Sequence, residues 1–244
     1  MNTPIDVSGK TALVTGANRG IGKAIVESFV TNGAKRVYAA VRTLETATPL
    51  VEAMGECIVP VTLDVTKPDT IAAAAAVATD VEIVVSNAGV LTQTGALSSQ
   101  VFENLGYEFD VNVFGLIRVA QAFAPALKAS GGGVLVQINS VASVKSFPGI
   151  TTYSASKAAA YSVTQGLRET LANQDTQVLS VHPGPIATDM AARAGMLEGT
   201  EPPEVVSEGI VAALKAGDVH LFPDAVARDF WKAYKGYAVP VVEG

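Results

Sequence analysis

Several residue types are scarce in this sequence, and each scarcity excludes something. A single cysteine, Cys57, among 244 residues rules out an intramolecular disulfide, so we expect the chain to fold in a reducing compartment. The two histidines, His182 and His220, have no further ligands at metal-binding spacing, and no metal site is predicted. Charged residues make up only 16% of the chain, the net charge is −6, and no basic cluster is present. This balance disfavours nucleic acid and anionic membranes as partners.

Long hydrophobic runs are missing as well. No apolar stretch approaches the roughly 18 residues of a membrane-spanning helix, and the N-terminal segment MNTPIDVSGK lacks the basic and apolar parts of a signal peptide. A cytoplasmic location without membrane contact is therefore expected. The chain is nevertheless 49% hydrophobic, and no linker, repeat or low-complexity segment divides it. These features predict one globular domain over residues 1–244.

Short apolar segments that favour strands alternate with alanine-rich segments that favour helices. This alternation predicts an α/β fold, with a mostly parallel seven-stranded sheet and helices on both of its faces. Pro125 predicts a kink or a break late in the third long helical segment. The predicted strands are 11–15, 36–40, 57–63, 82–86, 133–139, 177–181 and 220–222, and the predicted helices are 20–32, 67–79, 99–129, 152–173, 202–216 and one within 224–244.

A glycine-rich turn directly follows the first predicted strand. The sequence TGANRGIG (15–22) leads from that strand into a helical pattern. Glycine permits a sharp turn and a close approach of the backbone to a phosphate, and the following helix N-terminus offers N–H groups to an anion. Three glycines alone are weak evidence in a chain that has 22, and a plain turn is the alternative. The strand, loop and helix context favours a dinucleotide site.

Two arginines indicate which dinucleotide is bound. Arg42 follows the second predicted strand, where Asp or Glu would bind a ribose 2′-hydroxyl and Arg accommodates a 2′-phosphate. Arg19 lies within the glycine-rich turn, and its guanidinium suits the same phosphate. Either arginine alone is also typical of a solvated surface position. Together they favour NADP(H) over NAD(H) as the cofactor.

Tyr153 and Lys157 lie four positions apart, so a helix brings them to one face, and Ser140 precedes the tyrosine by thirteen positions. A phenol with a usual pKa of about 10 is a poor proton acceptor at neutral pH, and an adjacent ammonium lowers that pKa. A serine hydroxyl can stabilise charge on a carbonyl oxygen. Taken singly, a surface pair and a serine that merely ends a strand are the alternatives.

Seven motifs, in their order and spacing, resemble the short-chain dehydrogenase/reductase family. The resemblance covers nearly the whole chain and implies a Rossmann-type, doubly wound fold. One motif departs from the family, because Ser86 stands where an asparagine is usual. The motifs are TGANRGIG (15–22), LDV (63–65), SNAG (86–89), VNVFG (111–115), INSVAS (138–143), YSASK (153–157) and HPGPIATDM (182–190).

The resemblance implies hydride transfer between NADP(H) and a carbonyl or alcohol. Tyr153 would be the acid/base, and Lys157 would lower its pKa and hold the nicotinamide ribose. Ser140 would bind the substrate oxygen, and Asn112 would hold a water that links the lysine to solvent. His182 is expected to pack beside the nicotinamide loop. The implied cofactor contacts are Gly16, Asn18, Arg19, Gly20, Ile21, Arg42, Asp64, Val65, Asn87, Ala88, Gly89, Tyr153, Lys157, Pro183, Gly184, Ile186 and Thr188.

The substrate is expected to be a hydrophobic ketone or aldehyde, bound by Ser140, Tyr153 and the segment 189–216. Its apolar pocket would be lined by Phe147, Met190, Met196 and Leu197. A 3-oxoacyl-carrier-protein reductase is one alternative, although such enzymes usually end in a GG strand motif that this chain lacks. A steroid or sugar-alcohol dehydrogenase and an NADP(H)-binding redox regulator are the others. By resemblance, a homodimer or homotetramer is expected to form through the helical segments 99–129 and 152–173.

Overall fold

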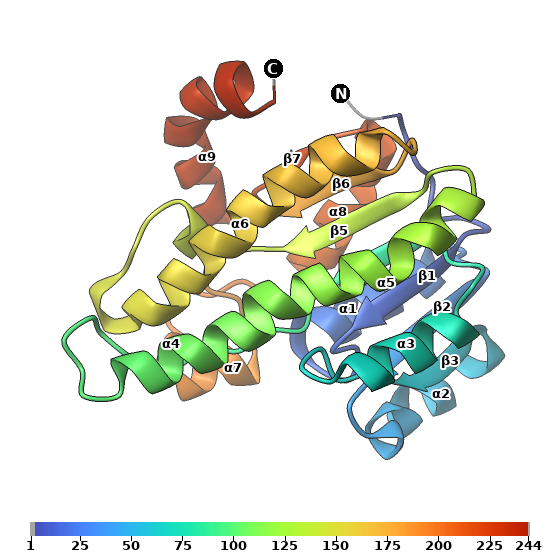
Figure 1. The fold of residues 1–244 in the computed structure, drawn as a ribbon, viewed down its shortest axis with the longest axis horizontal. Helices are drawn as coiled ribbons and strands as arrows, with labels where there is room; N and C mark the ends of the chain where they lie inside the picture. The colour runs from blue at the N-terminus through green and yellow to red at the C-terminus, as the bar shows by residue number, and fades with distance from the viewer. Residues whose placement is uncertain (1–2, 244) are drawn as a thin grey trace.

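A seven-stranded parallel sheet runs through the centre of the computed structural model, which describes residues 3–243 (Figure 1). Met1, Asn2 and Gly244, at the ends of the predicted domain, lie outside the described residues. The strand order is β3-β2-β1-β4-β5-β6-β7. The strands are β1 Thr11–Thr15, β2 Arg36–Val41, β3 Ile58–Thr62, β4 Ile83–Ser86, β5 Val134–Ile138, β6 Gln177–Val181 and β7 His220–Leu221.

Helices connect the strands and cover both faces of the sheet, as Figure 1 shows. A π-helical turn, Asp110–Phe114, joins α4 to α5, and a second one, Ala238–Val242, follows α9. The helices are α1 Gly20–Thr31, α2 Thr48–Met54, α3 Pro68–Val77, α4 Val101–Phe109, α5 Gly115–Ala129, α6 Thr151–Ala172, α7 Asp189–Arg193, α8 Glu204–Ala216 and α9 Ala225–Tyr237.

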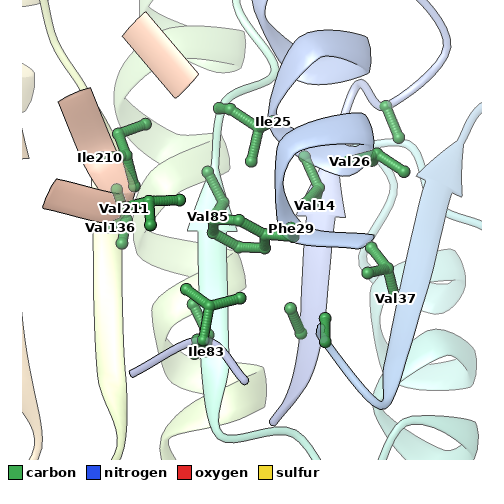
Figure 2. Packing of buried hydrophobic residues seen from close by; sticks show 14 of the residues in the cluster. Val14, Ile25, Val26, Phe29, Val37, Ile83, Val85, Val136, Ile210 and Val211 are labelled. Carbon is green, nitrogen blue, oxygen red and sulfur yellow. The ribbon is translucent and has the colours of Figure 1, made fainter. Parts of the chain in front are cut away.

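Side chains that alternate along each strand divide the core into two layers. On one face, Phe29 of α1 packs among Val14 of β1 and Ile210 of α8 (Figure 2). On the other face, Leu13 of β1 packs with Phe123 of α5. Fully burying one such side chain contributes about 1.5–3 kcal/mol. Burial on both faces explains why the strand sequences are continuously apolar instead of alternating.

The strand order reverses between β1 and β4. The chain first builds outward from β1 to β3 and then returns to place β4 on the other side of β1. Because all strand pairs are parallel, the loops that follow β1, β4, β5 and β6 leave the sheet at one common edge. In open α/β sheets this edge, at such a reversal, is where ligands bind.

All seven predicted strands are confirmed, with ends that differ by at most one residue. The predicted helix 99–129 is divided by the π-helical turn into α4 and α5. Of the kink or break expected at Pro125, the break is wrong, because α5 continues to Ala129, and the kink stays a prediction. Phe123 and Leu127, buried on either side of the proline, offset the loss of its backbone hydrogen bond.

Within residues 3–243, no helix combines the length and the hydrophobicity that crossing a lipid bilayer requires.

Candidate active site

The glycine-rich turn between β1 and α1 is folded tightly on itself. A Cβ on Gly22 would collide with the carbonyl oxygen of Gly16 and lie 2.5 Å from Asn87 Nδ2, so only glycine fits there. No side chain caps the N-terminus of α1, which begins at Gly20 after Arg19. The first N–H groups of this helix are therefore available to an anion. Both features fit the phosphates of a dinucleotide.

Asn87, in the turn after β4, fastens the glycine-rich turn. Its Nδ2 donates to Thr15 O over 2.8 Å, and the Thr15 hydroxyl accepts the backbone N–H groups of Asn87 and Ala88. These bonds tie together the ends of β1 and β4, where the strand order reverses. The side-chain amide of Asn87 is thus engaged within the protein, and its contact with a cofactor stays a prediction.

The predicted phosphate-binding arginines have different neighbours. Arg42, exposed after β2, is close enough to Asp64 to act on its charge. Burial acts to raise the pKa of the Asp64 carboxyl, but hydrogen bonds from Thr66 and nearby positive charge lower it overall. Arg19 Nη1 lies 3.5 Å from Asp189 Oδ2 at the start of α7.

A cavity of about 270 Å³ brings the glycine-rich turn together with the segment after β6. Asn18, Arg19 and Gly20 line it from one side, and Thr188 lines it from the other. The remaining predicted cofactor residues lie along the same edge of the sheet. They are Ile21 in α1, Val65 after β3, Ala88 and Gly89 after β4, and Ile186 after β6.

The segment after β6 is held at several points. Pro183 O accepts the Val141 N–H over 2.9 Å, and the Gly184 N–H donates to the buried Asp224 Oδ2 over 2.7 Å. Farther along, the Thr188 hydroxyl caps α7. The segment therefore crosses the edge of the sheet in a defined position, between the turn after β5 and the start of α9.

Ser140, Tyr153 and Lys157 come together beyond the carboxyl end of β5, and all three are nearly buried. Ser140 Oγ accepts the Ala142 N–H over 3.1 Å and donates to Pro183 O over 3.3 Å. Tyr153 and Lys157 lie in the first two turns of α6, and Lys157 Nζ is 5.8 Å from the centre of the tyrosine ring. The two side chains, four positions apart, therefore lie on one face of the helix, as the sequence predicts.

Burial shifts the pKa of the tyrosine and of the lysine in opposite directions. It raises the pKa of Tyr153 to about 12, with the Ser140 hydroxyl opposing this rise and the charge of Glu108 adding to it. It lowers the pKa of Lys157 to about 8. Lys157 Nζ donates to Ile138 O over 2.9 Å and lies over the ring face of Tyr153, so its lowering of the phenol pKa stays a prediction. The protein alone keeps the tyrosine protonated.

Asn112, in the π-helical turn, holds the segment that follows the Gly89 turn. Its Oδ1 accepts the Val90 N–H, and its Nδ2 donates to Val90 O and Ser156 Oγ, each over 2.9 Å. A Cβ on Gly89 would lie 3.2 Å from Asn112 Oδ1 and 3.7 Å from Lys157 Nζ. Asn112 and the lysine are therefore near each other, with Gly89 between them. That Asn112 holds a water there stays a prediction.

Two of the predicted substrate residues pack beside the tyrosine. Phe147 and Met196 contact the buried cluster that contains Tyr153, and Leu91, which sequence reasoning missed, joins them. Met190 and Leu197 lie outside this cluster and are 38% and 51% exposed. The apolar wall at the tyrosine therefore comes from the segments after β4 and β5 as well as from the segment 189–216.

His182 is fully buried next to the turn after β5 that contains Ser140 and Ser143. Its ring stacks on Phe222 at 4.6 Å, and its two nitrogens lie 2.9 Å from Ser143 Oγ and 2.8 Å from Ser180 Oγ. Burial, together with the charge of His220, lowers the pKa of His182 to about 3. The ring therefore stays neutral at physiological pH, which agrees with the expected packing role.

Sequence reasoning misses two buried acids near the site. Glu108 contacts Thr92, and Asp224 joins Gly184 to the N-terminus of α9. Asp224 precedes a helical pattern, so an N-cap signal was present. Glu108 gives no such signal, because a glutamate within a helix is usually solvated.

The family model for short chain dehydrogenases matches residues 10–197. The chain belongs to the short-chain dehydrogenase family. Its curated relatives include the glycine betaine reductase ATRR of Emericella nidulans, which is 34% identical over 226 residues. The match covers 86% of this chain and only 18% of that relative's length.

Two solved structures share the fold of this short-chain dehydrogenase. A short chain dehydrogenase from Burkholderia cenocepacia, in complex with NADP, is 32% identical with a TM-score of 0.89, and 97% of each chain is covered. A short chain dehydrogenase/reductase from Burkholderia phymatum, in complex with NAD, is 21% identical with a TM-score of 0.85, and 97% of this chain and 96% of that chain are covered. The protein is an oxidoreductase of this family, with a single Rossmann-like domain.

Proposed function

We propose that this short-chain dehydrogenase transfers a hydride between NADP(H) and a carbonyl or alcohol substrate, and that it reduces a hydrophobic ketone or aldehyde. The observation that carries the proposal is the convergence of Ser140, Tyr153 and Lys157 at the sheet edge that also presents the uncapped N-terminus of α1. Carbonyl reduction needs a hydride donor and a proton donor on one substrate. This edge offers a place for each.

The residues at the edge fit a nicotinamide dinucleotide, which supplies or accepts the hydride when bound. The α1 N-terminus would hold the pyrophosphate, and Asp64 would face the adenine. Arg19 and Arg42 would hold a 2′-phosphate, because guanidinium groups bind phosphate oxygens in pairs. The NADP complex of the relative from Burkholderia cenocepacia supports this preference.

The side chains around Tyr153 favour proton donation from its hydroxyl to the substrate oxygen. Because burial raises the pKa of Tyr153 to about 12, the hydroxyl carries its proton at neutral pH. Ser140 Oγ would donate a hydrogen bond to the same oxygen and stabilise its developing charge. Lys157, with a pKa of about 8, is charged at pH 7 and can return a proton to the phenolate.

The test is oxidation of NADPH and NADH, followed at 340 nm, across a panel of ketones and aldehydes. We expect reduction of apolar carbonyls with NADPH preferred, since Phe147 and Met196 line the tyrosine side of the site. Tyr153→Phe removes the proton donor and should lower kcat by about 10²- to 10⁴-fold. Tyr237→Phe, at an exposed tyrosine of α9, is the matched control and should not change the rate.

Three results would contradict parts of this proposal. NADPH binding without reduction of any carbonyl would favour a redox regulator. Strong preference for NADH would remove the role given to Arg19 and Arg42. An unchanged rate for Tyr153→Phe would remove the proposed acid/base.

A further inference from the structure

Glu108 is a fully buried acid near the catalytic tyrosine, and none of the steps above uses it. It lies in the last turn of α4 and is 0% exposed. Its Oε1 accepts the Thr92 N–H over 2.6 Å and the Thr92 hydroxyl over 2.8 Å. Its Oε2 is buried and has no hydrogen-bond partner. A buried carboxylate oxygen without a partner costs free energy, so stability alone does not explain this acid.

Glu108 and Asn112 hold the same segment at two successive points. Asn112 binds the backbone of Val90, and Glu108 binds Thr92. The two bonding residues are four positions apart along the helical segment, and the residues that they hold are two positions apart. Leu91, between the two bound residues, packs on the cluster that contains Tyr153. The pair therefore fixes the segment whose apolar side chain, Leu91, packs on the cluster around the tyrosine.

The same network reaches the helix that carries the tyrosine. Thr92 Oγ1 lies 3.4 Å from Thr152 Oγ1, and the Thr152 N–H donates to Thr94 O over 3.3 Å. Thr152 directly precedes Tyr153 in the first turn of α6. A displacement of Thr92 would thus act on the tyrosine through Leu91 and through Thr152.

Glu108 also acts on the tyrosine through its charge. Groups from three elements act on Tyr153. The charge of Glu108 of α4 and the hydroxyl of Ser140 after β5 act on the pKa of its phenol, and Lys157 of α6 lies over its ring. Glu108 adds to the rise in the phenol pKa that burial causes, and Ser140 opposes it. His182, the nearest histidine to Ser140, contacts its carbonyl oxygen and not the phenol.

We propose that Glu108 is a positioning residue for the proton-transfer step. It holds Thr92, and through it Leu91 and Thr152, in place around the tyrosine, so that the Tyr153 hydroxyl stays in position to give its proton to a substrate oxygen. This inference rests on the proposed function. It assigns a role in catalysis to Glu108 of α4, in addition to the role expected of Asn112 in the π-helical turn.

The test is the pH profile of Glu108→Gln in both reaction directions. Glutamine keeps the length of the side chain and an oxygen that can accept from Thr92, but it removes the charge. The alkaline limb of ketone reduction should move to lower pH, and kcat for alcohol oxidation at pH 8 should rise about fivefold. Glu108→Met, a second uncharged side chain of similar length, should shift the profile in the same direction if Glu108→Gln folds poorly. Glu103→Gln, an exposed acid on the same helix, is the control and should leave the profile unchanged.

A readout without turnover separates this inference from the proposed function. In protein labelled with ¹³Cζ-tyrosine, the Tyr153 signal, assigned with Tyr153→Phe, should begin to titrate at lower pH in Glu108→Gln than in the wild type. If the wild type reduces no carbonyl but this shift is found, the proposed function fails and the electrostatic action of Glu108 stands. Superimposable titrations and pH profiles of Glu108→Gln and wild type would overturn the inference and leave Glu108 a purely structural residue.

Discussion

Burial has opposite consequences for the two ionisable side chains on which the proposed reaction depends. It keeps Tyr153 protonated and weakens the charge on Lys157, whose pKa falls to about 8. The lysine is therefore an acid that releases its proton near physiological pH. Its state depends on pH in a range where the tyrosine does not titrate.

Lys157→Met should change how stability depends on pH. In the unfolded chain the pKa of a lysine is about 10.4, so between pH 8 and pH 10 the folded wild type binds fewer protons than the unfolded chain. The wild-type free energy of unfolding therefore rises with pH across this window, and the variant lacks that rise. The difference between the two proteins should change by about 2 kcal/mol between pH 7 and pH 10 in urea denaturation. Lys35→Met, at an exposed lysine, should track the wild type, whereas parallel curves for Lys157→Met would refute the assignment.

Residue spacing predicts which side chains meet, but it does not predict their ionisation. The spacings of Ser140, Tyr153 and Lys157 follow from helix geometry and strand order, both readable in the sequence. Whether an ammonium lies at a hydroxyl or over a ring depends on rotamers and on a competing carbonyl, here Ile138 O. Glu108 escapes prediction for the related reason that burial of one helix position depends on the neighbouring segment.

At the scale of elements, α9 supports the site from outside the sheet. Its Trp231 stacks on Phe222, and its Phe230 lies 6.3 Å from Phe147, the predicted substrate residue. The N-terminus of α9 is tied to Gly184 through Asp224. Trp231 and its aromatic neighbours in α9 cover a buried cluster that contains Val141 and Phe222.

Asp224→Ala should loosen α9 and the segment after β6 together. The variant loses the cap of α9 and leaves the Gly184 N–H without its acceptor, so the free energy of unfolding should fall by about 2 kcal/mol. KM for NADPH should rise more than KM for the carbonyl, because Gly184 is a predicted cofactor contact. Asp229→Ala, which removes only an exposed pair with Lys232, serves as the control. Equal effects of the two substitutions would contradict this role of Asp224.

Strands were easier to predict than short helices. Each strand is a compact apolar run with clear ends, so its pattern decides its position. By contrast, α2 and α7 span 7 and 5 residues, too few to show a helical period, and they were missed. The π-helical turn at Asp110–Phe114 preserves the helical composition around it and leaves no mark in the sequence.

At the scale of the whole molecule, α4 and the end of the π-helical turn carry exposed apolar side chains. Phe102 is 86% exposed, and Tyr107 and Phe114 are about half exposed. This surface lies on the predicted pairing segment 99–129, and a second copy of the chain would cover it. The dimer stays a prediction that rests on the resemblance and on this exposure.

Light scattering should find a dimer or tetramer at micromolar concentration. Phe102→Asp should raise the dissociation constant by at least about tenfold, because it places a charge in the apolar contact. Val226→Asp, at an exposed apolar residue of α9, is the comparison that should leave assembly unchanged. A wild type that is only monomeric would defeat the prediction.

Transfer of isotope tests the central claim most directly. The wild type is given NADPH deuterated at the reactive C4 position together with an apolar ketone, and the alcohol is examined by mass spectrometry. We predict one deuterium on the carbinol carbon, and almost no alcohol from Tyr153→Phe. An alcohol without deuterium, or labelled alcohol formed equally well by Tyr153→Phe, would contradict hydride transfer with Tyr153 as the proton donor.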